Sequence, residues 1–571
     1  ALAGAMVAVC AALFEGADAP VPGWSQRLLW LALPACASIL LLAVTNKMCL
    51  DVAVIPFLWV LPLGLYLLTF IISFDSPRWY SRFYYTLALA GAMVAVCAAL
   101  FEGADMDIVW QVAIYSGTLF AGCMVCHGEL YHLRPHPRHL TSFYLMIAAG
   151  GAVGGLFVAL VAPALFDNYY EMHLALALTV LLLLVISWRG RAGLTPLRWR
   201  VLCLLLALIG AAGLQRGLGA VGNWLRQEGF LEFARTSLWD RVGRFGWGVW
   251  VLLAVAIAVA WWWERRGRAL RWHAVTCALL IAGLAVLVTA LMFQVRSTTR
   301  GAVVSGRNFY GVLSVFEYEK QNPLSHHYLL QHGRITHGFQ FAADDRAPLV
   351  TSYFGPASGL GLAFRSFPRQ QNQRIGLLGL GVGTVTAYGK PGDLFRIYEI
   401  NPQVVDIARQ PFTYLARSRA RIELVMGDAR LSMEREAPQN YDFLIMDAFS
   451  SDAVPVHLLT REAFEIYARH IKPDGAILVN ISNRYLDLRP VVEQAARAFG
   501  YETHHIDSED GGLDDEEGGW WYYAASWMIL SKNKEFMNRE ELRRAASPPA
   551  PPRDDIRLWT DDYSSMFKIL K

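Results

Sequence analysis

Cysteine is missing from the whole second half of the chain. The 571 residues include eight cysteines, and the last of them is Cys277. A stretch of this length without cysteine has no disulfide framework, which is compatible with the cytoplasm.

Charge of either sign is also scarce. Charged residues make up 17% of the chain, hydrophobic residues make up 55%, and the formal net charge is +3. So small a net charge gives no reason to expect a nucleic-acid partner. The hydrophobic content is too high for an ordinary soluble protein of this length.

The apolar residues are concentrated before residue 296. Roughly nine apolar runs there have the length needed to cross a membrane. They cover residues 28–44, 54–74, 84–100, 108–126, 140–166, 174–188, 197–214, 247–263 and 274–295. Ionisable residues are almost absent from the middle of these runs, which counts against a transporter. We predict a transmembrane helical domain over residues 27–296.

Three local patterns in this half need separate interpretation. Residues 1–18 are identical to residues 88–105, so we treat residues 1–26 as an artefactual duplicate and leader. Four glycines in the fifth run form two small-xxx-small pairs, which favour close helix packing; they are Gly150, Gly151, Gly154 and Gly155. The sequence Cys123-Met-Val-Cys126-His127 matches a c-type haem attachment motif. Two small residues and a capping histidine at a helix end explain it more simply, and no distal haem ligand can be named, so haem is not expected.

A nucleotide site is predicted within residues 374–402. A short apolar strand, residues 375–378, is followed at once by a turn that contains Gly379, Gly381 and Gly383. Glycines let the backbone bend with positive φ and approach a ligand, and a helix is expected to follow. Because position 384 is threonine, the pattern is GxGxG and favours an S-adenosylmethionine-type cofactor over NAD.

Carboxylates follow the next three predicted strands. Glu399 ends FRIYEI, where it is placed to accept the ribose hydroxyls. Asp428 in MGDAR follows IELVM and is assigned to the adenine amino group, with Ala429 in the same cofactor site. Asp447 follows YDFLIM. The carboxyl ends of parallel strands meet at one edge of a sheet, so a ligand crevice is predicted there.

The predicted fold class is a multi-span α-helical membrane bundle plus an α/β, S-adenosylmethionine-methyltransferase-like (Rossmann-like) sheet with a small N-terminal β-hairpin subdomain. Strand-like alternation places the small β-rich subdomain at residues 297–373. The cofactor-binding domain is expected at residues 374–545, and a proline-rich linker and tail at residues 546–571. The histidines near residue 330 are interpreted as strand and turn residues, so no metal site is predicted.

These motifs resemble those of one enzyme family. The residues that carry the resemblance are LLQHGRITHGFQ, GLGVGT, YEINP, GDAR and DAFSSD. Residues from about 300 to 535 resemble the spermidine synthases, which are aminopropyltransferases. The whole chain resembles the bacterial membrane-fused spermidine synthase-like proteins. The resemblance implies transfer of an aminopropyl group from decarboxylated S-adenosylmethionine to an amine such as putrescine.

The resemblance also implies roles for particular residues. Asp447 is the catalytic residue that holds and deprotonates the attacking amine, with Asp452 of the same loop beside it. Gln340 and Tyr353 are implied to line the substrate cleft. The chain departs from the family where Val382 replaces a loop aspartate and Gly355 replaces a glutamate. These departures leave the choice between S-adenosylmethionine and its decarboxylated form open.

Two alternative functions remain open from the sequence. Val382 and Gly355 favour a methyltransferase that acts on an amine or lipid substrate. The large bundle favours a non-catalytic membrane scaffold or transporter-like protein with a cofactor-binding domain. The expected partners are a small-molecule amine and the lipid bilayer, and a homodimer or an association with other membrane proteins is left open.

The arginine distribution bears on orientation. Arginine is dense in the connections at residues 75–83, 127–138, 189–200 and 264–272. The positive-inside rule places these connections in the cytoplasm, and alternation through nine spans then puts the C-terminal domain outside. Because S-adenosylmethionine is made inside cells, we instead predict a multi-pass inner-membrane protein whose soluble domain is cytoplasmic. One late run, within residues 197–246, is then not a span.

Overall fold

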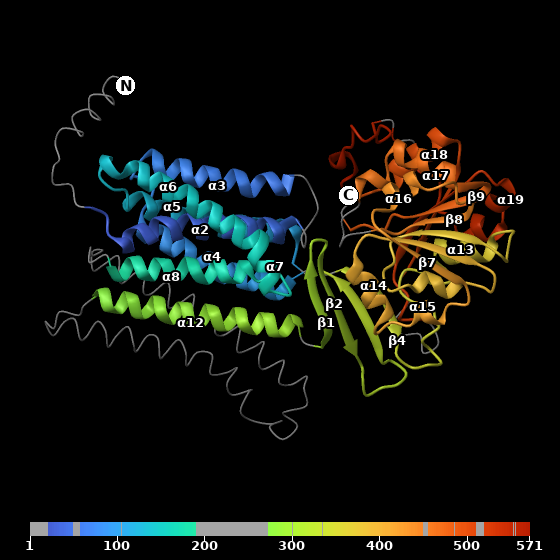
Figure 1. Cartoon of the computed structure of the whole chain (residues 1–571), viewed down its shortest axis with the longest axis horizontal. Coiled ribbons are helices and arrows are strands. Elements are labelled where there is room, and N and C mark those ends of the chain that lie inside the picture. Colours follow the sequence, from blue (N-terminus) through green and yellow to red (C-terminus); the bar gives the residue numbers. More distant parts are fainter. Residues whose placement is uncertain are drawn as a thin grey trace. The chain divides into compact units, whose positions relative to one another are not determined.

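The chain forms two compact units, a helical unit up to residue 300 and an α/β unit from residue 301 onward. Figure 1 colours the helical unit blue to green and the α/β unit yellow to red. The computed structural model describes residues 21–49, 57–103, 106–189, 272–299, 301–333, 335–448, 455–484, 486–509, 519–551, 553 and 555–571.

Seven helices within the described residues are long and apolar enough to cross a membrane. Six of them are α2 (Trp24–Lys47), α3 (Phe57–Asp75), α4 (Arg82–Glu102), α5 (Ile108–His132), α8 (Glu171–Arg189) and α12 (Trp272–Thr299). The seventh is a continuous run made of η3 (Pro137–His139), α6 (Leu140–Leu156), η4 (Phe157–Val161) and α7 (Ala162–Leu165). They coincide with seven of the predicted apolar runs. The runs at 197–214 and 247–263 lie outside the described residues, as does the segment interpreted as non-spanning.

Close packing of α6 on α2 depends on two of the four predicted glycines. A Cβ atom at Gly150 would lie 2.3 Å from the carbonyl oxygen of Leu31, and one at Gly154 would lie 2.4 Å from that of Ala35. Among the described residues, nothing lies within 4 Å of a Cβ atom placed at Gly151 or Gly155. Only one small-xxx-small pair therefore forms the helix contact, because residues four apart share one face of a helix.

One ion pair is buried at the end of α5. The Glu129 carboxylate is fully buried and accepts hydrogen bonds from Arg82 Nε at 2.6 Å and Nη2 at 2.5 Å. The Tyr80 hydroxyl donates a third hydrogen bond to it at 2.8 Å. Because both carboxylate oxygens have partners, the charge is compensated in an apolar setting.

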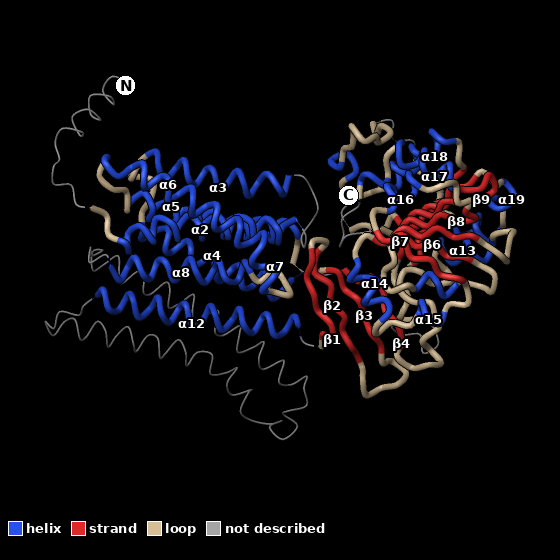
Figure 2. The backbone as a smooth tube through the Cα atoms, viewed as in Figure 1, coloured by secondary structure: helices blue, strands red, loops and turns tan. Residues whose placement is uncertain are grey.

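The α/β unit contains two sheets (Figure 2). The smaller sheet is antiparallel, in the order β1 (Ala302–Asn308), β2 (Gly311–Tyr318), β3 (His327–His332) and β4 (Ile335–Phe341). The larger sheet has seven strands in the order β10-β11-β9-β8-β5-β6-β7. Its strands are β5 (Arg374–Leu378), β6 (Leu394–Glu399), β7 (Arg421–Met426), β8 (Tyr441–Met446), β9 (Ile471–Asn480), β10 (Glu502–Ser508) and β11 (Ala525–Ser531).

Strands β5 to β9 pair in parallel, and β10 and β11 join β9 as an antiparallel edge. Leu377 and Leu378 of β5 are both buried but belong to different core clusters, because successive side chains point to opposite faces. Both faces are therefore packed, as in other parallel sheets.

The helices of this unit are α13 (Gly359–Ser366), α14 (Pro402–Arg409), α15 (Tyr414–Arg417), α16 (Ala429–Arg435), α17 (Arg461–His470), α18 (Arg489–Phe499), α19 (Lys534–Met537) and α20 (Glu540–Ala545). Its 3₁₀ turns are η5 (Thr384–Tyr388), η6 (Val456–Leu458) and η7 (Met566–Ile569).

The prediction of a helix after the glycine turn is wrong, because the helical segment there is much shorter than expected. Only the five-residue 3₁₀ turn η5 forms there. The β-branched residues Thr384, Val385 and Thr386 are poor helix formers, and the sequence Gly389-Lys390-Pro391-Gly392 stops any continuation. The glycine turn is therefore held by its surroundings and not by a long following helix.

Candidate active site

The glycine turn after β5 uses a backbone conformation that favours glycine. Gly379, Gly381 and Gly383 have φ angles of +89°, +54° and +87°. A Cβ atom at Gly379 would lie 2.5 Å from the backbone oxygen of Asp447. The turn and the loop after β8 are therefore in direct backbone contact, which any side chain at position 379 would prevent.

Glu399 fixes this turn to the end of β6. One carboxylate oxygen accepts a hydrogen bond from the Leu380 amide at 2.9 Å, and the other accepts one from the Asn401 amide at 2.8 Å. The side chain is buried, and this burial raises the pKa of Glu399 above its ordinary value. A carboxylate has about four acceptor positions, so beside the amides of Leu380, Asn401 and Ile400 it can still accept a hydrogen bond from a ribose hydroxyl.

Asp428, just after β7, already has two partners. Its Oδ1 accepts a hydrogen bond from the Leu431 amide at 2.9 Å and so caps α16, while His457 Nε2 lies 2.9 Å from its Oδ2. Ala429 is the first residue of that helix and is buried. An adenine amino group would have to share or replace the contact with His457.

Asp447, directly after β8, is paired with the end of β9. Asn480 Nδ2 donates a hydrogen bond to its Oδ1 over 2.7 Å. Desolvation by the surrounding protein raises the pKa of Asp447 to about 7, although the Asn480 hydrogen bond opposes the shift. Burial first, and the nearby Asp447 charge second, raise the pKa of Tyr353. Asp452 lies outside the described residues.

Gln340 on β4 forms hydrogen bonds to two neighbouring loops and does not share the surroundings of Tyr353. Its amide nitrogen donates to the Ala347 carbonyl at 2.8 Å and to the Thr413 hydroxyl at 3.0 Å. Its amide oxygen accepts from the Thr413 backbone amide at 2.7 Å. These hydrogen bonds hold two loops to the strand, and Gln340 is not among the residues that line the cavity described next.

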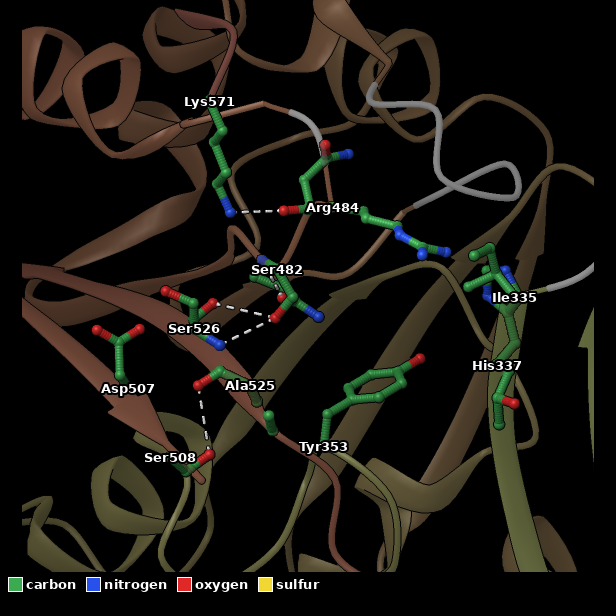
Figure 3. A pocket seen from close by; sticks show the side chains of 14 residues that line it. Ile335, His337, Tyr353, Ser482, Arg484, Asp507, Ser508, Ala525, Ser526 and Lys571 are labelled. Atoms are coloured by element: carbon green, nitrogen blue, oxygen red, sulfur yellow. Dashed lines mark hydrogen bonds between the residues drawn. The ribbon is translucent and has the colours of Figure 1, made fainter. Parts of the chain in front are cut away.

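A cavity of about 520 Å³ opens beside the large sheet, where β9 and β10 end and β11 begins (Figure 3). Tyr353 projects into it, with His337 of β4 on one side and the start of β11 on the other. The lining residues are Ile335, Thr336, His337, Tyr353, Asn480, Ser482, Asn483, Arg484, Asp507, Ser508, Ala524, Ala525, Ser526 and Lys571. Its volume falls within the range of small-molecule sites.

Sequence reasoning missed most of these residues. Asn480 could have been found, because it is a further polar residue at the end of an apolar strand, GAILVN. His337 was counted among the histidines interpreted as strand and turn residues and was not assigned to the site, yet its Nε2 is buried and has no hydrogen-bond partner among the described residues. Burial, with a smaller effect of His332, lowers the pKa of His337 to about 3, so the ring is neutral at physiological pH.

The described residues contain no group of three or more side chains suited to hold a metal ion. In the histidine-rich hairpin, His326 contacts Glu317, His327 contacts the Ser325 carbonyl and His332 contacts the Tyr310 carbonyl. In the helical unit, the Cys123, Cys126 and His127 side chains are buried within the continuous helix α5.

The parallel strand order, the glycine turn and the carboxylates at the carboxyl edge define a Rossmann-like sheet of the methyltransferase type. No protein-family model matches the chain. A polyamine aminopropyltransferase from Vibrio vulnificus is 34% identical over 125 residues, which cover 21% of this chain and 40% of that protein. Putrescine N-methyltransferase 2 from Nicotiana tabacum is 30% identical over 94 residues, covering 16% of this chain and 27% of that protein.

The chain thus matches less than half the length of either relative. Both are transferases by name, and the similarity supports homology of this part of the chain to them. Among solved structures, a probable spermidine synthase from Corynebacterium glutamicum aligns with a TM-score of 0.32 and 19% identity, over 42% of this chain and 83% of that one.

Proposed function

We propose that the α/β unit transfers an alkyl group from an adenosyl-sulfonium donor to the nitrogen of an amine. The first candidate is aminopropyl transfer from decarboxylated S-adenosylmethionine to a polyamine-type amine. The observation that carries the proposal is the Asp447 carboxylate, desolvated at the carboxyl edge of the sheet, bonded to Asn480 and close enough to Tyr353 to affect its pKa.

The chemistry of the acceptor fits this carboxylate. An alkylamine with a pKa of about 10.4 is protonated at neutral pH and must lose its proton before it attacks the carbon beside the sulfonium. As the nitrogen–carbon bond forms, the bond from that carbon to sulfur breaks, and its electron pair leaves with the sulfur as a neutral thioether. A base works best when its pKa lies near the working pH, and Asp447, with a pKa of about 7, meets that condition. Its negative charge also attracts the cationic form of the amine.

Methyl transfer from S-adenosylmethionine is the second candidate, favoured by Val382. This residue is 1% exposed and belongs to the hydrophobic core, and its Cγ2 would lie 2.7 Å from a Cβ atom at Gly338. The spermidine synthases have an aspartate at this position, and Val382 in its place offers no negative charge to an amine. Similarity to a putrescine N-methyltransferase supports the same candidate.

The helical unit is proposed to anchor this transferase in the cell inner membrane, with the α/β unit in the cytoplasm. The seven long apolar helices support membrane insertion. The supply of S-adenosylmethionine inside cells supports the cytoplasmic placement of the α/β unit.

The test is a transfer assay on the full chain in detergent or nanodiscs. Each donor, S-adenosylmethionine or its decarboxylated form, is incubated with a panel of amines, and products are identified by mass spectrometry. We expect an alkylated amine whose added mass separates aminopropyl from methyl transfer. Donor binding without any transfer would instead favour the scaffold alternative, and no binding of either donor would refute the proposal.

A further inference from the structure

The C-terminal tail, residues 555–571, is fixed to the helices that cover one face of the large sheet. The Trp559 carbonyl accepts a hydrogen bond from the Arg461 amide, at the start of α17, over 2.8 Å. Residues 569–570 pair with residues 486–487 through an antiparallel bridge and one backbone hydrogen bond. Three apolar side chains of the tail are buried in the core cluster that contains residues of α17 and α18; they are Ile556, Trp559 and Ile569. The tail is therefore part of the folded unit.

Asp561 of this tail forms an ion pair with Arg430, the second residue of α16. Arg430 Nη1 donates to Asp561 Oδ1 at 2.7 Å, and Nη2 donates to Oδ2 at 2.6 Å. The Thr460 hydroxyl donates to the same Oδ1 at 2.9 Å, and the Asp561 amide donates to the Glu462 carboxylate at 3.0 Å. The hydrogen bonds from Arg430 lower the pKa of Asp561 to about 2, so its carboxylate is ionised at physiological pH. Asp561 thus ties α16 to the start of α17.

This ion pair differs from most pairs at a protein surface. Such pairs usually contribute little, because solvent screens the charges and two flexible side chains must be ordered. Here the Arg430 side chain is 14% exposed, and its planar guanidinium meets both carboxylate oxygens. Asp561 is more exposed, but its own amide and the Trp559 carbonyl are both bonded to α17. We therefore expect the loss of this pair to have a measurable effect.

Arg430 also contacts the segment that lies against Asp428. Its Nη1 donates to the His457 carbonyl, in η6, at 2.9 Å, and His457 Nε2 lies 2.9 Å from Asp428 Oδ2. Asp428 caps α16 two residues before Arg430, so these three residues close a ring of contacts between η6 and α16. The His457 side chain is 49% exposed, which leaves its contact with Asp428 accessible to a ligand.

We propose that Asp561 is a positioning residue for the adenine end of the donor. It fixes Arg430, and Arg430 in turn holds His457 and Asp428 in the arrangement that receives the adenine. Asp561 acts through Arg430 and not by contact with the adenosine. This inference rests on the proposed function, because Asp428 is a donor-binding residue only if the α/β unit binds an adenosyl-sulfonium donor. It makes the C-terminal tail a part of the donor site.

Calorimetric titration of the full chain in detergent with 5′-methylthioadenosine tests this role. The ligand keeps the adenosine of the donor and lacks its amino-acid tail, so it reports on the adenine end. Asp561→Asn removes the charge with little change of shape and should weaken binding about threefold to tenfold. Asp561→Glu keeps the charge and should recover part of the loss. Asp555→Asn is the matched control, because it breaks an ion pair with Arg553 inside the same tail and should bind with wild-type affinity.

Two further measurements distinguish positioning from a general loss of stability. Arg430→Gln should weaken binding at least as much as Asp561→Asn, and the double variant should lose little more, because both changes break the same pair. In the transfer assay, Asp561→Asn should raise the KM for the donor by the factor seen in calorimetry and leave kcat within about twofold, since Asp447 is unchanged. Thermal unfolding of each variant shows whether the fold is intact.

The outcomes separate this inference from the function on which it rests. If wild-type protein does not bind 5′-methylthioadenosine, the proposed function fails and the inference fails with it. If wild type binds and Asp561→Asn binds equally well, only the inference is refuted. An equal loss of affinity in Asp555→Asn would refute it as well, because any disturbance of the tail would then have the same effect.

Discussion

Asn480 Nδ2 donates a hydrogen bond to Asp447 Oδ1 over 2.7 Å and so joins the carboxyl ends of β9 and β8. Asn480 also lines the cavity, and Asp447 influences the ionisation of Tyr353 within it. The carboxylate is thereby oriented by a neutral donor, which leaves its negative charge available to the amine of the proposed transfer.

Asp447→Asn is expected to lower turnover by about 10²–10⁴, the usual contribution of a positioned base. The amide oxygen can still accept from Asn480, so the loop should keep its shape and donor binding should persist. The measurement is the initial rate of alkyl transfer together with donor affinity. In wild type the rate should rise with pH through about 7, because only the ionised carboxylate of Asp447 accepts a proton. A variant that loses stability but keeps its rate per folded molecule would identify Asp447 as structural.

The raised pKa of Asp447 also leads us to expect that the stability of the fold depends on pH. Its pKa is about 7 in the folded chain and about 4 when unfolded, so between these values the folded state holds a proton that the unfolded state has lost. The contribution of Asp447 to stability therefore falls as pH rises from about 4 to 7. Relative to wild type, Asp447→Asn should gain up to about 4 kcal/mol between pH 4 and pH 8 in denaturant titrations. A constant difference across this range would contradict the raised pKa.

Two variants of Asp428 separate helix capping from adenine binding. Asparagine is also a good N-cap residue, so Asp428→Asn should keep α16 stable, whereas Asp428→Ala should cost about 0.5–2 kcal/mol of unfolding free energy. If the carboxylate accepts the adenine amino group, both variants should bind 5′-methylthioadenosine more weakly. Calorimetry and thermal unfolding on the same samples provide the readout. Wild-type affinity in Asp428→Asn would leave this aspartate with the capping role alone.

In the helical unit, Arg82→Gln should destabilise the bundle by about 3–5 kcal/mol, because Glu129 would stay buried with Tyr80 as its one remaining side-chain hydrogen-bond partner among the described residues. The double variant Arg82→Gln with Glu129→Gln should recover most of that loss, since no charge then remains unpaired. Arg78→Gln, at an exposed position on the same connection, is the control. Thermal unfolding in detergent measures all four proteins, and equal losses in the single and double variants would count against the burial argument.

A reporter cysteine in the α/β unit tests the orientation. Lys320 is well exposed, and Lys320→Cys should resist a membrane-impermeant maleimide in intact cells and react after lysis. Unmodified protein gives the background from native cysteines, of which Cys36, Cys49, Cys123 and Cys126 are buried. Labelling of intact cells would place this unit outside and would restore the simple alternation through nine spans.

Hydrophobic periodicity was sufficient to place Glu399, Asp428 and Asp447 at consecutive strand ends, where the structure also has them. Strand ends are recognisable because an apolar run stops at a polar residue, and parallel pairing brings such ends to one edge. The bundle was likewise predictable wherever the apolar runs lie within the described residues.

The remaining cavity residues depend on long-range pairing that local patterns do not encode. Lys571 reaches the cavity only because the tail pairs with residues 486–487, and Ser526 reaches it because β11 runs antiparallel to β9. His337 lies on a strand of the other sheet, and no spacing rule connects it to the large one. The short turn η5 was missed because the expectation of a helix after a glycine turn overrode the weak helix propensity of Thr384, Val385 and Thr386.

The close approach of Gly379 to the backbone oxygen of Asp447 constrains which residue can stand at position 379. With no room for even one methyl group between them, a side chain at position 379 would have to push one of the two segments aside. A substitution at position 379 would therefore disturb the backbone at Asp447 as well as the glycine turn. We therefore expect substitutions to be tolerated better in the side chains that line the cavity than at position 379.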